Sequence, residues 1–207
     1  MTHSRERVIS SDYMEWAKTK SGATYSLATS GVMPFPLAEL PVTIEDLEIN
    51  GPSTYGYEPL QTALARKCGV AEQCVVASTG TSMANHLALA ATIEPGDHVL
   101  IENPTYELLT SAALYLGAEV RTFDRRFENQ FRIDPDDVAR AVTPKTRLIV
   151  ITNLHNPTGA FTDARTLTAL GEIATRAGAR VLVDEVYLEA MFDQAPRSAF
   201  HLGDHFI

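Results

Sequence analysis

Polar and aromatic side chains gather in four short stretches of the sequence, and each stretch directly follows an apolar run. The stretches are STGTS at residues 78–82, NPTY at 103–106, NLHNPTG at 153–159 and DEVY at 184–187. Small hydroxyl-bearing residues that open a helix suit a phosphate, because free backbone N–H groups and the positive end of the helix dipole lie there. Tyr106 could stack on a planar ligand. The residue types therefore indicate the binding of a phosphate and of a flat ring.

Each stretch also has a purely structural explanation. Ser78 or Thr79 could simply cap the helix that follows, and Tyr106 could be a packing residue whose hydroxyl is satisfied. Asp184 follows an apolar run, where a charge is costly to bury unless a cation or several donors meet it, so a solvated or capping acid is the alternative. No dinucleotide glycine fingerprint, P-loop lysine or Gly-x-Ser-x-Gly elbow occurs in the sequence, which disfavours NAD, nucleoside triphosphates and serine-hydrolase chemistry.

A regular alternation of short apolar runs and helical patterns positions these stretches. The pattern predicts strands over 74–77, 98–102, 118–123, 147–151 and 180–185, and helices over 58–69, 81–93, 105–117, 134–142 and 162–178. Strands that alternate with helices of this length form crossover connections, so we expect an α/β fold with a mainly parallel sheet and helices on both faces. Ligands bind outside the carboxyl ends of such strands, which is where the polar stretches lie.

The N-terminal part of the chain lacks this alternation. Residues 21–41 contain three prolines and two glycines with no sustained period. We therefore expect an irregular N-terminal arm over residues 1–47, followed by the α/β domain over residues 48–207.

Composition narrows the class of partner and the compartment. The chain has 207 residues, a net charge of −9 and no basic cluster, which argues against nucleic acid or an anionic membrane and for a small molecule. No apolar run has signal-peptide or membrane-helix length, and two cysteines form no disulfide framework, so we expect a cytoplasmic protein. His201 and His205 flank a glycine and lack a third ligand in sequence, so we expect no metal site.

The four motifs, in this order, resemble those of the pyridoxal-phosphate-dependent aminotransferases of class I and II, which have fold type I. The resemblance runs from about Gly31 to the end of the chain. It implies pyridoxal 5′-phosphate (PLP) as cofactor, an amino acid and a keto acid as substrates, and a homodimer as the assembly. It assigns the cofactor's 5′-phosphate to Gly80, Thr81 and Ser82. It also assigns ring stacking to Tyr106, the ring oxygen O3′ to Asn156 and Tyr187, the pyridine nitrogen to Asp184, and substrate contact to Gly31.

The sequence departs from the family pattern in one major respect. The family's Schiff-base lysine follows the aspartate by a few tens of residues, and Lys18, Lys20, Lys67 and Lys145 all lie in other contexts. We therefore expect that lysine beyond Ile207, with residues 48–207 forming part of the PLP-binding large domain. The C-terminal small domain is then absent, and the 207-residue chain is a fragment that is inactive by itself.

The scaffold alone leaves the reaction open. Transamination is the main hypothesis. A C–S lyase, a decarboxylating synthase or a cyclase is a second possibility, because such enzymes share these motifs. A non-catalytic PLP-binding regulatory module is a third.

Overall fold

The structure is a computed structural model that describes residues 11–20, 22, 24–25, 35–51, 55–194 and 196–207. The chain forms two compact units, one over Asp12–Ala77 and one that contains Ser78–Ile207. No helix within the described residues is long and apolar enough to span a bilayer. Gly31, which the resemblance assigns to substrate contact, lies outside the described residues.

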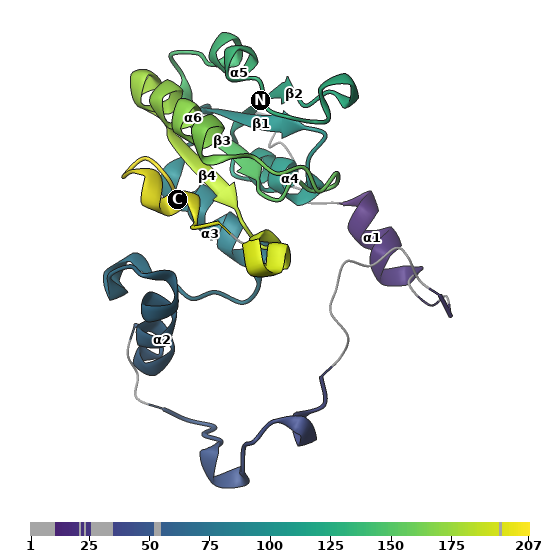
Figure 1. Cartoon of the computed structure of the whole chain (residues 1–207), viewed down its shortest axis with the longest axis vertical. Helices are drawn as coiled ribbons and strands as arrows, with labels where there is room; N and C mark the ends of the chain where they lie inside the picture. The colour runs from purple at the N-terminus through teal and green to yellow at the C-terminus, as the bar shows by residue number, and fades with distance from the viewer. Residues whose placement is uncertain (1–10, 21, 23, 26–34, 52–54, 195) are drawn as a thin grey trace, which may run out of the picture. The chain divides into compact units, whose positions relative to one another are not determined.

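A parallel four-stranded sheet forms the centre of the unit that contains Ser78–Ile207 (Figure 1). Its spatial order is β2–β1–β3–β4, and the strands are β1 (His98–Asn103), β2 (Glu119–Asp124), β3 (Thr146–Thr152) and β4 (Arg180–Asp184). Ile101 pairs with Val150, and Thr152 pairs with Asp184. Because all the strands point the same way, their carboxyl ends lie along one edge.

Helices cover both faces of this sheet, as the alternation in the sequence predicts (Figure 1). They are α3 (Thr81–Thr92), α4 (Glu107–Tyr115), α5 (Pro135–Ala141) and α6 (Ala164–Ala177). Leu100 and Ile149 pack with the buried side chains of α5 and α6, whereas their neighbours Val99 and Leu148 pack with those of α3 and α4. Successive strand residues point to opposite faces, so an uninterrupted apolar run fills two cores at once.

Local signals set the ends of these helices. Asp163 accepts a hydrogen bond from the Thr166 amide at the start of α6, and Gly178 ends the helix in the left-handed conformation at a φ of 67°. An acidic N-cap and a C-terminal glycine satisfy the backbone groups that a helix leaves unpaired. Helix α6, which has 14 residues, therefore begins at Ala164, shortly after the polar stretch Asn153–Gly159.

Within the described residues of the unit Asp12–Ala77, the structure has two helices and three short 3₁₀ turns. The helices are α1 (Asp12–Thr19) and α2 (Glu58–Cys68), and the turns span Leu37–Glu39, Ile44–Asp46 and Glu72–Cys74. The expectation of irregular structure up to residue 47 is wrong at α1. Acidic Asp12 and Glu15 in the first turn and Lys18 in the last turn complement the helix dipole, and none of its residues is buried. Local charges, and not a packed face, therefore favour this helix.

The strand predicted over residues 74–77 is absent. Cys74 ends a 3₁₀ turn, residues 75–77 form no strand, and Val76 is 80% exposed. A run of four residues contains too few apolar side chains to hold an extended conformation without a neighbouring strand to complete its hydrogen bonds.

The chain after β4 turns back along the sheet. It forms 3₁₀ turns at Leu188–Gln194 and Ala199–Leu202, and Phe206 then makes a parallel bridge to Val181. The Val181 amide donates to the His205 carbonyl over 2.8 Å, and the Ile207 amide donates to the Val181 carbonyl over 2.9 Å. The outer side of β4 therefore has a hydrogen-bonded neighbour.

Candidate cofactor-binding site

The carboxyl ends of β1, β3 and β4 bring three of the polar stretches to one edge of the sheet. Thr152 lies opposite Asp184 in the pairing of β3 with β4, and the Asn153 amide donates to the Asp184 carbonyl over 2.8 Å. Pro104, which follows β1, accepts a hydrogen bond from His155 over 2.9 Å. The segments that begin at Asn103, Asn153 and Asp184 are therefore neighbours in space.

Asp184 is an almost fully buried carboxylate at this edge, with 6% of its surface exposed. Asn85 Nδ2 on α3 donates to Asp184 Oδ2 over 2.7 Å, and the Val186 amide donates to Oδ1 over 3.1 Å. Both oxygens therefore have a donor, as a buried acid requires, and both donors are neutral. A cationic ligand would face a carboxylate whose charge no protein cation contacts within the described part of the chain.

The fourth stretch lies at the beginning of α3. Gly80 is the N-cap at a φ of 79°, and Thr81 and Ser82 form the first turn. Among the described residues, no side chain caps this helix, and a Cβ placed on Gly80 would meet no heavy atom within 4 Å. Because Asn85 follows one turn later and contacts Asp184, the uncapped amides lie on the same side of the sheet as the buried carboxylate.

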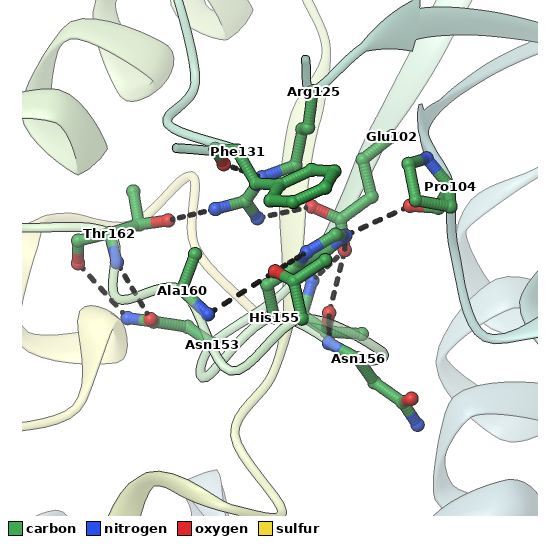
Figure 2. Close-up of polar contacts among 11 residues, drawn as sticks. Glu102, Pro104, Arg125, Phe131, Asn153, His155, Asn156, Ala160 and Thr162 are labelled. Carbon is green, nitrogen blue, oxygen red and sulfur yellow. Dashed lines mark hydrogen bonds and ion pairs between the residues drawn. The ribbon is translucent and has the colours of Figure 1, made fainter. Parts of the chain in front are cut away.

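The loop after β3 folds tightly on itself and presents the side chain of Asn156. The Asn156 amide donates to Thr152 Oγ1 over 2.8 Å, the Gly159 amide to the His155 carbonyl over 2.7 Å, and the His155 amide to the Ala160 carbonyl over 2.9 Å. Figure 2 shows the Asn156 side chain pointing away from this cluster. It makes no hydrogen bond within the described residues, so its donor and acceptor remain available to a ligand.

His155 is buried and acts as a neutral crosslink between the loop and the segment after β1. Its Nε2 lies 2.9 Å from the Pro104 carbonyl, which only accepts, so Nε2 carries the proton and Nδ1 accepts from the Thr158 hydroxyl at 2.6 Å. Burial, together with the nearby charge of Arg125, lowers the pKa of His155 to about 4. The unfolded chain takes up this proton near the ordinary pKa of 6.5, so His155 lowers the stability of the fold as pH falls from 6.5 to about 4.

A buried ion pair between Glu102 and Arg125 supports the same loop. Arg125 Nη1 donates to Glu102 Oε2 over 2.7 Å, and neither side chain has any exposed surface. Burial raises the pKa of Glu102 to about 7, although the Arg125 charge and the donors of Thr152 oppose this shift. The donors that surround Glu102 favour the carboxylate form, because a guanidinium and a backbone amide cannot accept a proton.

The two tyrosines of the motifs, Tyr106 and Tyr187, are less buried than Asp184. Tyr106 is the N-cap residue of α4 and is half-buried against the core formed with α3 and α4. Its packing matches the structural alternative, although a half-buried ring keeps a surface for stacking. Tyr187 is also half-buried, in the turn after Asp184, where the Ala190 amide donates to its carbonyl.

Several residues of this region were missed when the sequence was read alone. Asn85 lies inside an apolar helix pattern, and Arg125 lies in the charged run DRRFEN, so both resemble ordinary residues. Glu102 had a usable signal, because it ends the apolar run HVLIE in the same way that Asp184 ends RVLVD. A buried strand that ends in an acid requires a donor or a cation nearby.

Comparisons with known proteins agree on one family. The family model of aminotransferases of class I and II matches residues 46–205. The chain is 37% identical over 148 residues to the probable N-succinyldiaminopimelate aminotransferase DapC of Mycobacterium tuberculosis, covering 68% of this chain and 37% of that protein. It is 34% identical over 185 residues to capreomycidine synthase of Streptomyces vinaceus, covering 84% of this chain and 47% of that protein.

Solved structures show the same likeness. A PLP-dependent aminotransferase from Streptococcus suis matches with a TM-score of 0.71 at 33% identity, covering 78% of this chain and 43% of that chain. The chain thus spans less than half the length of each of these three proteins.

Proposed function

The chain belongs to the class I and II aminotransferase family, and from this premise we propose that the whole protein transfers an amino group from an amino acid to a keto acid. The family depends on PLP. The observation that carries the proposal is Asp184, a buried carboxylate at the ligand edge of the sheet whose hydrogen-bond partners are the neutral groups of Asn85 and Val186. Such an acid is suited to a protonated pyridine nitrogen.

The other donors at this edge fit the remaining groups of PLP. The side-chain amide of Asn156 has no partner within the described residues and can donate to the ring oxygen O3′, with Tyr187 as a second donor. The uncapped start of α3 offers backbone N–H groups to the 5′-phosphate, and the hydroxyls of Thr81 and Ser82 add donors. Tyr106 provides a ring for stacking.

The chemistry divides between the cofactor and the protein. When bound, PLP accepts the electrons that remain on the substrate Cα after a proton leaves. Asp184 keeps a proton on the pyridine nitrogen, which makes the ring a better electron acceptor. Asn85 and the Val186 amide hold Asp184 in place, because each engages one of its oxygens. Lys145 follows α5 and precedes β3, at the amino edge of the sheet, and is therefore on the wrong side to act on the substrate.

A second candidate reaction has specific support. Capreomycidine synthase matches a larger share of this chain than the aminotransferase of M. tuberculosis does, and its name is that of a synthase. A PLP-dependent synthase or cyclase would use the same residues to hold the cofactor. The two candidates differ in product, because only transamination converts the acceptor keto acid into an amino acid.

We extend the proposal to a homodimer as the assembly and to the cytoplasm as the location. A homodimer would cover apolar side chains on the outer surfaces of α3 and α4, where Met83, Leu87 and Leu114 are 47%, 43% and 56% exposed. A cytoplasmic location would suit an enzyme of soluble amino and keto acids. Sedimentation of the whole protein tests the dimer, and fractionation of cells tests the location.

The deciding experiment identifies the product. The whole protein is incubated with PLP, a panel of amino acids and an isotopically labelled keto acid, and both the keto acid and its amination product are measured by mass spectrometry. We expect a labelled amino acid to form with the wild type and to be lost with Asp184→Ala. Product formation without amination of the keto acid would favour the synthase. Amination at the wild-type rate in Asp184→Ala would contradict the assignment of Asp184.

A further inference from the structure

The loop that presents Asn156 is closed at its base by two hydrogen bonds. Asn153 Nδ2 donates to the Thr162 carbonyl over 3.1 Å, and the Thr162 amide donates to Asn153 Oδ1 over 3.0 Å. One side chain thus pairs with both backbone groups of a residue nine positions later. Both residues are buried, so the loop between Asn153 and Thr162 has a fixed beginning and a fixed end.

Glu102 holds the beginning of this loop (Figure 2). Its Oε1 accepts from the Thr152 amide over 2.6 Å and from the Thr152 hydroxyl over 2.7 Å. The Thr152 hydroxyl oxygen in turn accepts from the Asn156 amide over 2.8 Å. A continuous chain of hydrogen bonds therefore connects the Glu102 carboxylate to the backbone of Asn156 itself.

Arg125 holds the end of the loop. Its Nη2 donates to Thr162 Oγ1 over 3.3 Å, and its Nε donates to the Phe131 carbonyl over 2.6 Å. Its Nη1 donates to Glu102 over 2.7 Å. One ion pair therefore connects the residue before the loop with the residue that ends it.

Stability alone does not explain why a charged pair occupies this position. Apolar residues of the same volume usually stabilise a core as well as a buried ion pair does, because burying two charges requires the loss of their hydration. A charged pair differs because its hydrogen bonds have a defined direction: Glu102 Oε1 accepts from both donors of Thr152, and Oε2 accepts from Arg125. Thr152 and Thr162 present polar groups to the pair, which an apolar substitute could not satisfy.

We propose that Glu102 and Arg125 are positioning residues that fix the loop Asn153–Thr162 and so hold the Asn156 side chain in the orientation that binds the cofactor. This inference deepens the proposed function and rests on it for the identity of the cofactor. The fixing of the loop is a property of the protein without ligand and can be measured separately.

Hydrogen exchange of the ligand-free whole protein measures the loop directly. Glu102→Gln keeps the shape of the side chain but removes its charge, and Thr152→Val removes the hydroxyl that connects Glu102 with Asn156 while leaving the ion pair intact. Ile173→Ala on α6 is the control, because it weakens the core without contacting the loop. The quantity compared is the exchange rate of amides in residues 153–162 divided by that of amides in α4, which does not carry the control substitution.

We expect this ratio to rise about tenfold or more in Glu102→Gln and Thr152→Val, equivalent to about 1.4 kcal/mol. In Ile173→Ala the ratio stays within about threefold of the wild type, because exchange there rises through general destabilisation. An unchanged ratio in Thr152→Val overturns the proposed link to Asn156. If Glu102→Gln fails to fold, Thr152→Val still decides that link.

Titration with PLP, followed by absorption and circular dichroism, tests the consequence for the cofactor. We expect the Kd for PLP to rise in both variants by about 2- to 10-fold, which is the range for loss of one neutral hydrogen bond from Asn156, and the induced circular dichroism of bound PLP to change. A mobile loop with wild-type PLP affinity and spectrum would overturn the positioning role. If the wild type binds no PLP, the proposed function fails, whereas the exchange ratio still shows whether the ion pair fixes the loop.

Discussion

The hydrogen bond between Asn85 and Asp184 allows a quantitative test, because the protein contains a matched pair on its surface. Asn85 Nδ2 lies 2.7 Å from Asp184 Oδ2, and both residues are 6% exposed. Asn103 Nδ2 lies 3.0 Å from Asp124 Oδ1, and both of these residues are exposed. The same hydrogen bond, from an asparagine side-chain amide to an aspartate carboxylate, therefore occurs once in a buried place and once at the surface.

The expected magnitudes follow from this difference in burial. A buried hydrogen bond to a charged group contributes roughly 1.5–3 kcal/mol, and its loss leaves Asp184 Oδ2 without its side-chain donor. Asn85→Ala should therefore lower the free energy of unfolding by about 2 kcal/mol. Asn103→Ala should change it by no more than about 0.5 kcal/mol, because water replaces an exposed partner.

Urea unfolding of the whole protein, followed by circular dichroism, gives both values at one pH. The double variant Asn85→Ala/Asp184→Ala completes a thermodynamic cycle with the two single variants. We expect Asn85→Ala to have a smaller effect in the Asp184→Ala background, by at least about 1 kcal/mol, because the partner is already absent.

Two results would refute this reasoning. Equal losses of stability for Asn85→Ala and Asn103→Ala would mean that burial does not strengthen the contact. A coupling energy near zero would mean that Asn85 stabilises the fold through packing of α3 and does not hold Asp184.

Further outcomes follow from the site. Asp184→Ala in the whole protein should lower the rate of amino transfer about 100-fold or more while the folded circular dichroism spectrum persists; a wild-type rate would contradict its role at the pyridine nitrogen. Asn156→Ala and Tyr187→Phe should each raise the Kd for PLP by about 2- to 10-fold, because each removes one neutral hydrogen bond of about 0.5–1.5 kcal/mol, and titration by absorption measures this. The stability advantage of the wild type over His155→Asn should shrink by up to about 3 kcal/mol as pH falls from 6.5 to 4, because only the wild-type unfolded chain gains a proton there; an advantage independent of pH would show that His155 is not held neutral. Borohydride reduction of the 207-residue chain with PLP should give no stoichiometric adduct at Lys145, and mass spectrometry showing such an adduct would place the cofactor at the other edge of the sheet.

Much of the fold could be predicted from the sequence, because the spacing of apolar residues indicates helices and strands, and glycines and prolines mark where they end. The apolar runs of β1 and β3 are long enough to be buried on both faces, and Gly69 and Gly178 end helices in the left-handed conformation that glycine adopts most readily. The pattern failed in two places, for different reasons. Residues 74–77 have strand-like composition but no strand beside them, and α1 is a helix without a buried face.

The sequence by itself determined the order of the elements and the placement of polar motifs after strands, since both depend on neighbours along the chain. From this placement we predicted that Asp184, Asn156 and the start of α3 are parts of a ligand site. Which groups meet Asp184 and the loop was decided only by the tertiary structure. Asn85 lies 99 positions from Asp184, and Glu102 lies 23 positions from Arg125 and 50 from Thr152. No local pattern encodes such pairs, because a buried charge gains its partner only when the sheet and its helices have brought distant segments together.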